Sequence, residues 1–209
     1  RQAQRTRSFT GILCVREQDT AVVEGMGSIV YRTPGHLWTR ARAMIGMGGE
    51  RQDMVLLKAV EQVNERQKQL LFDKVRRHFG DKLAGLTFAV WGLAFKPRTD
   101  DMRDAPAVNL IESLLGAGAR VQAFDPEAME EARKIFGDRI QYTHRNYDAL
   151  HGAAALLIVT EWNEFRRPDF ARVKNLLTNP VIFDGRNVYD PADLRKLGFT
   201  YYSIGRNHG

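Results

Sequence analysis

The chain has 209 residues, of which 44% are hydrophobic and 27% are charged, and its formal net charge is +6. These proportions are ordinary for a globular chain, and no stretch approaches the roughly 18 apolar residues of a membrane span. The amino-terminal ten residues lack the apolar core of a secretory signal, and the single Cys14 cannot form an internal disulfide. We therefore expect a cytoplasmic protein that does not bind membranes. The positive charge allows an anionic ligand, but no basic tract with interleaved aromatic residues points to nucleic acid.

Residues 1–52 show no sustained period of 2 or 3.6, and they contain eight arginines but no lysine. Their scattered glycines weaken any helix prediction. We expect an irregular segment, whose composition and lack of periodicity would suit an out-of-frame or truncated remnant. Within it, the apolar neighbours of Cys14 favour a small buried side chain over a reactive thiol.

Residues 53–80 change in pattern, because apolar side chains recur near helical spacing. They are Leu56, Val60, Val63, Leu70, Leu71, Val75 and Phe79. Asp53 is a plausible N-cap and Gly80 a stop signal. The pattern predicts one long amphipathic helix that packs on a domain or on a partner subunit.

Residues 81–209 alternate between short apolar runs and amphipathic stretches. The expected strands are residues 86–95, 120–124, 140–143, 154–160, 181–183 and 200–204. The expected helices are residues 104–117, 127–136, 146–151, 168–177 and 191–197. Asp104 is the expected N-cap of the first of these helices, with Pro106 in its first turn. The alternation predicts a doubly wound α/β domain with a mostly parallel, Rossmann-like sheet.

Ligands of such sheets bind outside the carboxyl ends of the strands, where the loop after residues 86–95 carries several charges. The dinucleotide fingerprint G-x-G-x-x-G is absent, because Gly92 stands alone. Lys96 suits a phosphate, Arg103 can make two parallel hydrogen bonds, and the following helix start adds backbone donors. The alternative is a structural loop in which Asp100 and Asp101 neutralise its arginines.

Two further loops and one acidic residue lie at expected strand ends. Arg186, in D-G-R-N, could clamp a diphosphate together with Lys96, or the string could simply form a turn. Glu161 could act as a base or bind a sugar hydroxyl, although a hydrogen bond to the backbone is favoured. Asp125 stands where an acid holds a ribose in dinucleotide folds, but without the glycine fingerprint we favour a capping role before Pro126.

Catalytic groups are not evident. None of the five histidines has a triad partner in the sequence pattern, and no cluster has metal-ligand spacing. We therefore predict no catalytic and no metal-binding residue in this chain.

Six strings occur in a specific order along the chain. They are A-V-E-Q-V-N-E-R-Q-K at 59–68, W-G-L-A-F-K-P-R-T-D-D-M-R-D-A-P at 91–106, A-F-D-P at 123–126, V-T-E-W-N-E-F-R at 159–166, I-F-D-G-R-N at 182–187 and G-F-T-Y-Y-S-I-G-R at 198–206. Together they resemble the UDP-glucose dehydrogenase family, within the nucleotide-sugar 6-dehydrogenases. The resemblance covers about residues 56–206.

The resemblance implies NAD-dependent oxidation of the C6 alcohol of UDP-glucose to the carboxylate of UDP-glucuronate. It implies two hydride transfers and intermediates bound to an active-site cysteine. Residues 53–80 would be the central helix of a homodimer, and residues 81–209 the UDP-binding domain. Phe95, Lys96 and Arg186 would contact the UDP-sugar, and Arg103 would reach the NAD held by another domain.

The chain also departs from the family, in ways as specific as the matching strings. The NAD-binding Rossmann domain and the cysteine motif G-Y-G-G-S-C-F-P-K-D have no counterpart here, and residues 1–52 do not resemble the family. We therefore expect the chain to be inactive alone. The alternatives are a stand-alone nucleotide-sugar-binding module and a dehydrogenase of another nucleotide sugar, such as a UDP-N-acetylhexosamine or GDP-mannose.

Overall fold

The computed structural model describes residues 55–205, with the side chains of residues 59–205. The irregular segment expected for residues 1–52, the N-cap expected at Asp53 and the thiol of Cys14 lie outside these residues.

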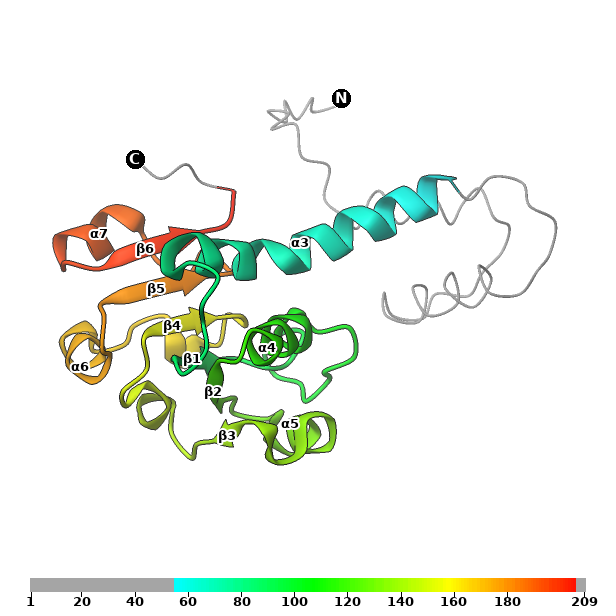
Figure 1. Cartoon of the computed structure of the whole chain (residues 1–209). Coiled ribbons are helices and arrows are strands. Elements are labelled where there is room, and N and C mark those ends of the chain that lie inside the picture. The colour runs from blue at the N-terminus through cyan, green and yellow to red at the C-terminus, as the bar shows by residue number, and fades with distance from the viewer. Residues whose placement is uncertain (1–54, 206–209) are drawn as a thin grey trace, which may run out of the picture. The chain divides into compact units, whose positions relative to one another are not determined.

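Within the described residues, six strands form one open sheet in the order β3-β2-β1-β4-β5-β6 (Figure 1). The strands are β1 (Thr87–Trp91), β2 (Arg120–Phe124), β3 (Gln141–Tyr142), β4 (Ala155–Ile158), β5 (Val181–Asp184) and β6 (Thr200–Ser203). The helices are α3 (Val55–Phe79), α4 (Pro106–Gly116), α5 (Met129–Phe136), α6 (Phe170–Leu176) and α7 (Pro191–Lys196), with 3-10 turns η1 (Gly137–Arg139), η2 (Asn146–Leu150) and η3 (Asn163–Phe165). Every pair of neighbouring strands is parallel, which confirms the predicted doubly wound α/β class.

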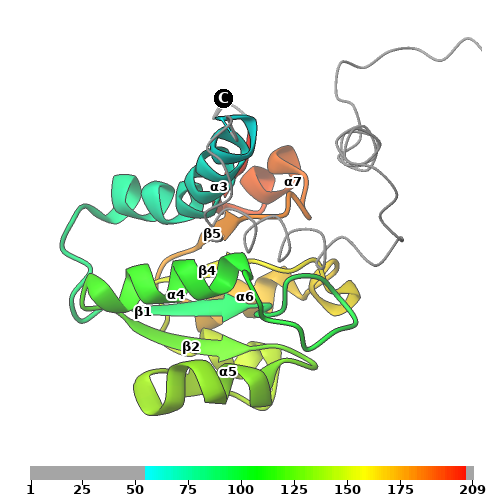
Figure 2. The ribbon, with the colours of Figure 1, turned by 90° about the vertical axis from the view of Figure 1, so that its right-hand side faces the viewer.

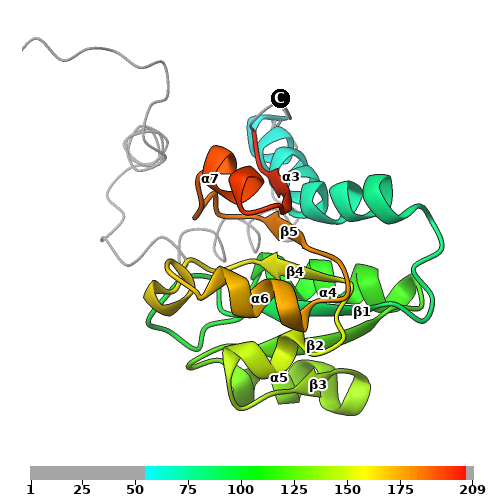
Figure 3. The same cartoon turned by 90° about the vertical axis from the view of Figure 1, so that its left-hand side faces the viewer.

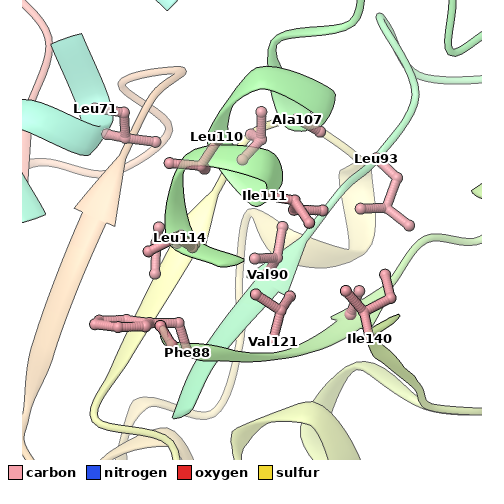
Figure 4. Packing of buried hydrophobic residues seen from close by; sticks show 14 of the residues in the cluster. Leu71, Phe88, Val90, Leu93, Ala107, Leu110, Ile111, Leu114, Val121 and Ile140 are labelled. Atoms are coloured by element: carbon pink, nitrogen blue, oxygen red, sulfur yellow. The ribbon is translucent and has the colours of Figure 1, made fainter. Parts of the chain in front are cut away.

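The sheet has helices on both faces, which Figures 2 and 3 show from opposite sides. Helices α3, α4 and α5 cover one face, and η2, α6 and α7 cover the other. On the first face the α4 side chains pack onto β1 and β2 (Figure 4); the labelled residues include Ala107, Leu110, Ile111 and Leu114 above Phe88, Val90 and Val121. On the second face the largest fully buried side chains are Trp91 and Phe165, whose rings stack with centroids 5.1 Å apart. Strands buried on both faces explain the continuous apolar runs in the sequence.

The predicted cap of α4 is wrong. Ala105 is its N-cap residue, with extended backbone (φ −62°, ψ 133°), whereas Asp104 has a positive φ of 55°. The reason is Pro106, which occupies the first turn as expected, because a proline restricts the residue before it to extended backbone. The cap position therefore falls one residue later than the side-chain chemistry of Asp104 indicated.

Helix α3 packs on the sheet through its carboxyl-terminal half, where Leu71 and Val75 are buried. Its amino-terminal part extends past the sheet (Figure 1), and there Val60 and Val63 are 44% and 52% exposed. The helix ends at Gly80, whose φ of 78° is the left-handed conformation typical of helix termination. Neither α3 nor any other helix among residues 55–205 is long and apolar enough to cross a membrane.

Candidate functional site

The candidate site lies at the carboxyl edge of the central strands. Strand β1 pairs with β2 on one side and with β4 on the other, so the winding of the chain reverses between β1 and β4. In open α/β sheets, ligands bind in the crevice outside such a switch point. The three loops singled out in the sequence, which follow β1, β4 and β5, all leave the sheet at this edge.

Arg186 joins these three loops. Its Nε donates to the Val159 carbonyl at 2.7 Å, and its Nη2 donates to the Phe95 carbonyl at 2.8 Å. Arg186 itself follows β5, while Val159 follows β4 and Phe95 lies in the loop after β1. The other N–H groups of its guanidinium make no hydrogen bond to the described part of the chain, and the side chain is 29% exposed. The guanidinium is therefore fixed by backbone on one edge and still able to donate to a ligand.

Asp184 holds the turn that carries Arg186. Its carboxylate is fully buried and accepts hydrogen bonds from the backbone N–H groups of Arg186 (2.8 Å), Val188 (2.7 Å) and Tyr189 (3.2 Å) and from the Tyr201 hydroxyl (2.8 Å). The sequence offered a simple turn and an anion-binding arginine as alternatives. In the structure the same loop forms the turn and leaves the Arg186 side chain partly exposed. This role of Asp184 was not predicted from the sequence, although an aspartate before glycine at a strand end was a usable signal.

Gly185 and Asn187 fix the same turn from its two sides. A Cβ on Gly185 would lie 3.0 Å from the Ile158 carbonyl oxygen and 3.3 Å from the Leu71 side chain on α3, so the close approach favours glycine. Asn187, with a φ of 54°, exchanges hydrogen bonds of 3.0 and 2.9 Å with the backbone of Ile204. These contacts leave Arg186 little freedom of backbone movement.

The loop after β1 presents Phe95 and Lys96 on the outside. Phe95 is 49% exposed, and Lys96 is exposed beside it. The Phe95 N–H donates to the Asp101 carbonyl at 2.9 Å, which folds the loop back on itself. Because Arg186 binds the Phe95 carbonyl, its guanidinium lies against the backbone of the loop that carries Phe95 and Lys96.

Arg103 lies farther along this loop and is paired with Asp101. Its backbone N–H, Nε and Nη2 donate to the Asp101 carboxylate at 3.0, 2.9 and 2.7 Å. The hydrogen bonds from Arg103 lower the pKa of Asp101, and the charge of Lys96 adds a smaller effect in the same direction. The ion pair offered as the alternative is therefore present between Asp101 and Arg103. The Arg103 side chain is nevertheless 79% exposed. Asp101 binds only the edge of the planar guanidinium that carries Nε and Nη2.

Asp125 fills the position that holds a ribose in dinucleotide-binding folds. It is 1% exposed, and both of its oxygens are used. They accept hydrogen bonds from the N–H groups of Leu93 (2.7 Å), Ala94 (3.1 Å), Glu127 (2.9 Å) and Ala128 (2.9 Å) and from the Trp162 indole (3.2 Å). Asp125 therefore closes the turn before α5 rather than capping the helix, whose N-cap residue is Ala128, and it also holds the loop after β1. A carboxylate buried and occupied in this way has no oxygen left for a ribose hydroxyl.

Gly92, directly after β1, is approached closely by Thr160. A Cβ there would lie 2.5 Å from the Thr160 Cβ, and the Thr160 hydroxyl donates to the Ala94 carbonyl at 2.6 Å. Thr160 thus packs directly against Gly92, which explains why a glycine stands at this position.

Glu161 differs from the expectation that it binds backbone. Its Oε2 lies 3.1 Å from Arg186 Nε and forms an ion pair. This oxygen is buried, yet it accepts no hydrogen bond from any described residue, because the Nε proton is directed at the Val159 carbonyl. Glu161 is therefore a counter-charge to Arg186.

The described residues contain no group of three or more His, Cys, Asp or Glu side chains that could hold a metal ion. The chemistry that these residues offer is the binding of an anion beside an exposed aromatic ring.

The family model for the UDP-binding domain of the UDP-glucose/GDP-mannose dehydrogenase family matches residues 89–191, which include all three loops. Over 159 residues the chain is 45% identical to the UDP-glucose 6-dehydrogenase of Pseudomonas aeruginosa, an alignment that covers 74% of this chain. This chain belongs to the UDP-glucose/GDP-mannose dehydrogenase family. A second UDP-glucose 6-dehydrogenase, from Rhizobium meliloti, is 44% identical over 151 residues, or 72% of this chain.

A solved structure of a UDP-glucose dehydrogenase from Pyrobaculum islandicum has the same fold, with a TM-score of 0.65 at 30% identity over 81% of this chain. The match covers 35% of that structure, as it covers 35% and 34% of the two enzymes above. The chain thus spans about a third of the length of these members of its family.

Proposed function

We propose that this chain supplies the UDP-binding half of a UDP-glucose 6-dehydrogenase. The observation that carries the proposal is the placement of Arg186. Its bonds to the Val159 and Phe95 carbonyls bring the cations after β5 and β1 to one edge of the sheet. In this family, the part of the ligand shared by all UDP-sugars is a diphosphate that links a uridine to a sugar.

The described residues suit that ligand. Lys96 offers a compact ammonium and Arg186 a planar fork, and such charge-assisted hydrogen bonds to phosphate are the strong ones. The half-exposed ring of Phe95 adds an apolar surface next to both cations, as binding sites for small molecules usually combine apolar walls with a few placed polar groups. We assign Phe95, Lys96 and Arg186 to the UDP-sugar.

NAD would be the hydride acceptor, held outside the described domain. The loop after β1 lacks a glycine-rich phosphate fingerprint, and the Asp125 carboxylate is buried and bonded to backbone, which supports this placement. Arg103 is 79% exposed, and one edge of its guanidinium is left open by Asp101, so it is the residue we expect to reach an NAD bound by another domain.

The complete reaction would be the two-step oxidation of UDP-glucose to UDP-glucuronate. The nucleophilic cysteine and the NAD domain that this needs are expected in sequence that resembles no part of this chain, so we expect no turnover by the chain alone. Residues 53–80 are the proposed homodimer helix, and the exposed Val60 and Val63 on its projecting half are consistent with a covered surface. We expect the protein to work in the cytoplasm.

Two alternative functions share the same crevice. In one, the chain is a stand-alone binding module; in the other, it belongs to a dehydrogenase of another nucleotide sugar, such as a UDP-N-acetylhexosamine or GDP-mannose. Titration of the chain with UDP-glucose, UDP-N-acetylglucosamine and GDP-mannose separates these sugars. Preference for GDP-mannose would contradict the assignment to UDP.

The proposal is tested by isothermal titration of UDP-glucose into the wild-type chain and into Lys96→Ala and Arg186→Ala. Each substitution removes a charged partner of a phosphate and should weaken binding by about 1.5–3 kcal/mol. Lys82→Ala is the matched control, because Lys82 is an exposed lysine before β1, at the opposite edge of the sheet. Equal affinities for all four proteins would refute the diphosphate site.

A further inference from the structure

Glu161 places a negative charge inside a crevice built to bind an anion. Its carboxylate lies 3.1 Å from Arg186 Nε, and its side chain is 34% exposed. It does not orient the guanidinium through a hydrogen bond, because Nε and Nη2 already donate to the carbonyls of Val159 and Phe95. What Glu161 contributes at this point is therefore charge rather than geometry.

The charge has a consequence for the kind of phosphate that binds. A carboxylate near the diphosphate site repels every added negative charge on the ligand, and in a half-exposed site this repulsion is moderate. A diphosphate esterified at both ends, as in a UDP-sugar, lacks the terminal ionisation of free UDP. A terminal phosphate gains that extra charge above a pKa of about 6. The repulsion is accordingly larger for UDP than for a UDP-sugar at neutral pH.

We propose that Glu161 is a specificity-determining residue that disfavours free UDP relative to UDP-sugars through its charge beside Arg186. The inference rests on the proposed function, since it takes the diphosphate to lie at Lys96 and Arg186. For the complete enzyme it would mean that a nucleoside diphosphate released from the sugar is a weak competitor for the site.

The matched control is Glu164, in the 3-10 turn η3 that begins two residues after Glu161. Burial and the charge of Asp125 raise the pKa of Glu164, and among the described residues it is Glu161 that forms the ion pair with Arg186. Glu161→Gln removes the charge and keeps the shape, while Glu164→Gln removes an equal charge at a short distance along the chain. Circular dichroism melts of both variants establish that they are folded.

The experiment is a titration of UDP and of UDP-glucose into the wild-type chain, Glu161→Gln and Glu164→Gln at pH of about 8, where the terminal phosphate is ionised. For Glu161→Gln we expect the ratio Kd(UDP)/Kd(UDP-glucose) to fall about two- to fivefold, mainly because UDP binds more tightly. The fall should shrink in high salt, which screens partly exposed charges. For Glu164→Gln the ratio should stay at the wild-type value.

Three outcomes overturn the inference. An unchanged ratio in Glu161→Gln removes the charge discrimination. Weaker binding of both ligands shows instead that Glu161 orients Arg186. An equal fall of the ratio Kd(UDP)/Kd(UDP-glucose) in Glu164→Gln shows that any negative charge nearby has the same effect. If neither ligand binds the wild-type chain or either variant, the proposed diphosphate site itself fails, which is a distinct result.

Discussion

Among single residues, Arg186 uses one edge of its guanidinium for the fold, and we propose that the other edge binds the ligand. The bonds to the carbonyls of Val159 and Phe95 hold three loops together, so the residue shapes the crevice as well as charging it. A substitution that keeps the charge can separate these two contributions.

Arg186→Lys keeps the positive charge but cannot span both carbonyls, because an ammonium on a flexible stem lacks the planar fork. Losing two ordinary hydrogen bonds of about 0.5–1.5 kcal/mol each should lower both thermal stability and the affinity for UDP-glucose. Calorimetric titration and melting curves of the variant check this. Wild-type affinity in Arg186→Lys would show that charge alone is sufficient.

Asp125 is the second residue whose substitution we expect to have a large effect, in this case on stability. Asp125→Ala leaves several buried N–H groups without an acceptor, and each such group costs about 1–3 kcal/mol. We expect a loss of roughly 3 kcal/mol or more in the free energy of unfolding, measured in urea. Asp190→Ala is the control, because Asp190 is an exposed helix cap of α7 worth about 1 kcal/mol. Equal losses in the two variants would contradict the structural role of Asp125.

The sequence pointed to Lys96 and Arg186 as candidate cations, but not to the backbone groups that Asp184 and Asp125 hold. Lys96 and Arg186 were recognisable because each follows an apolar run, where parallel strands end at a common edge. Asp184 and Asp125 act by accepting hydrogen bonds from backbone groups of distant loops, for example Leu93 and Asp125, which are far apart in the sequence. Such partners exist only after the strands have paired, so the sequence pattern did not indicate them.

At the level of elements, the predicted strands and helices are confirmed with small differences in their ends. The apolar run 86–95 is longer than β1 because its last residues leave the sheet to meet Asp125 and Arg186. The start of α4 was misplaced because the backbone restriction by Pro106 outweighed the capping chemistry of Asp104. Both errors arise at the site, where the loop serves contacts other than regular secondary structure.

Helix α3 contains a histidine that should make the stability of the domain depend on pH. His78, in its last turn, lies 2.9 Å from the Tyr202 hydroxyl of β6, and burial lowers the pKa of His78 below its usual 6.5. The unfolded chain therefore binds the proton more readily than the fold does, so this stability is complete above the unfolded pKa and is lost as pH falls below it. Urea unfolding at several pH values from about 5 to 7.5 should show the loss in the wild type and a smaller one in His78→Gln. Identical pH profiles for the two proteins would contradict the assignment.

For the whole domain, the doubly wound class was predictable, whereas the strand order and the place of α3 were not. The alternation of strands and helices indicates parallel pairing, but the order β3-β2-β1-β4-β5-β6 depends on long-range contacts. The place of α3 against β5 and β6 likewise depends on contacts such as that between His78 and Phe183. The order matters for the proposed function because it sets the switch point between β1 and β4, at the edge from which the loops of Lys96 and Arg186 leave.

The central claim is that this domain binds the UDP part of a nucleotide sugar and not a dinucleotide. The most direct measurement is calorimetric titration of the 209-residue chain with UDP-glucose and, separately, with NAD. We predict saturable binding of UDP-glucose at one site and no saturable binding of NAD, since the loop after β1 lacks the glycine-rich fingerprint and Asp125 is buried and bonded to backbone. Saturable binding of NAD without binding of UDP-glucose would contradict it.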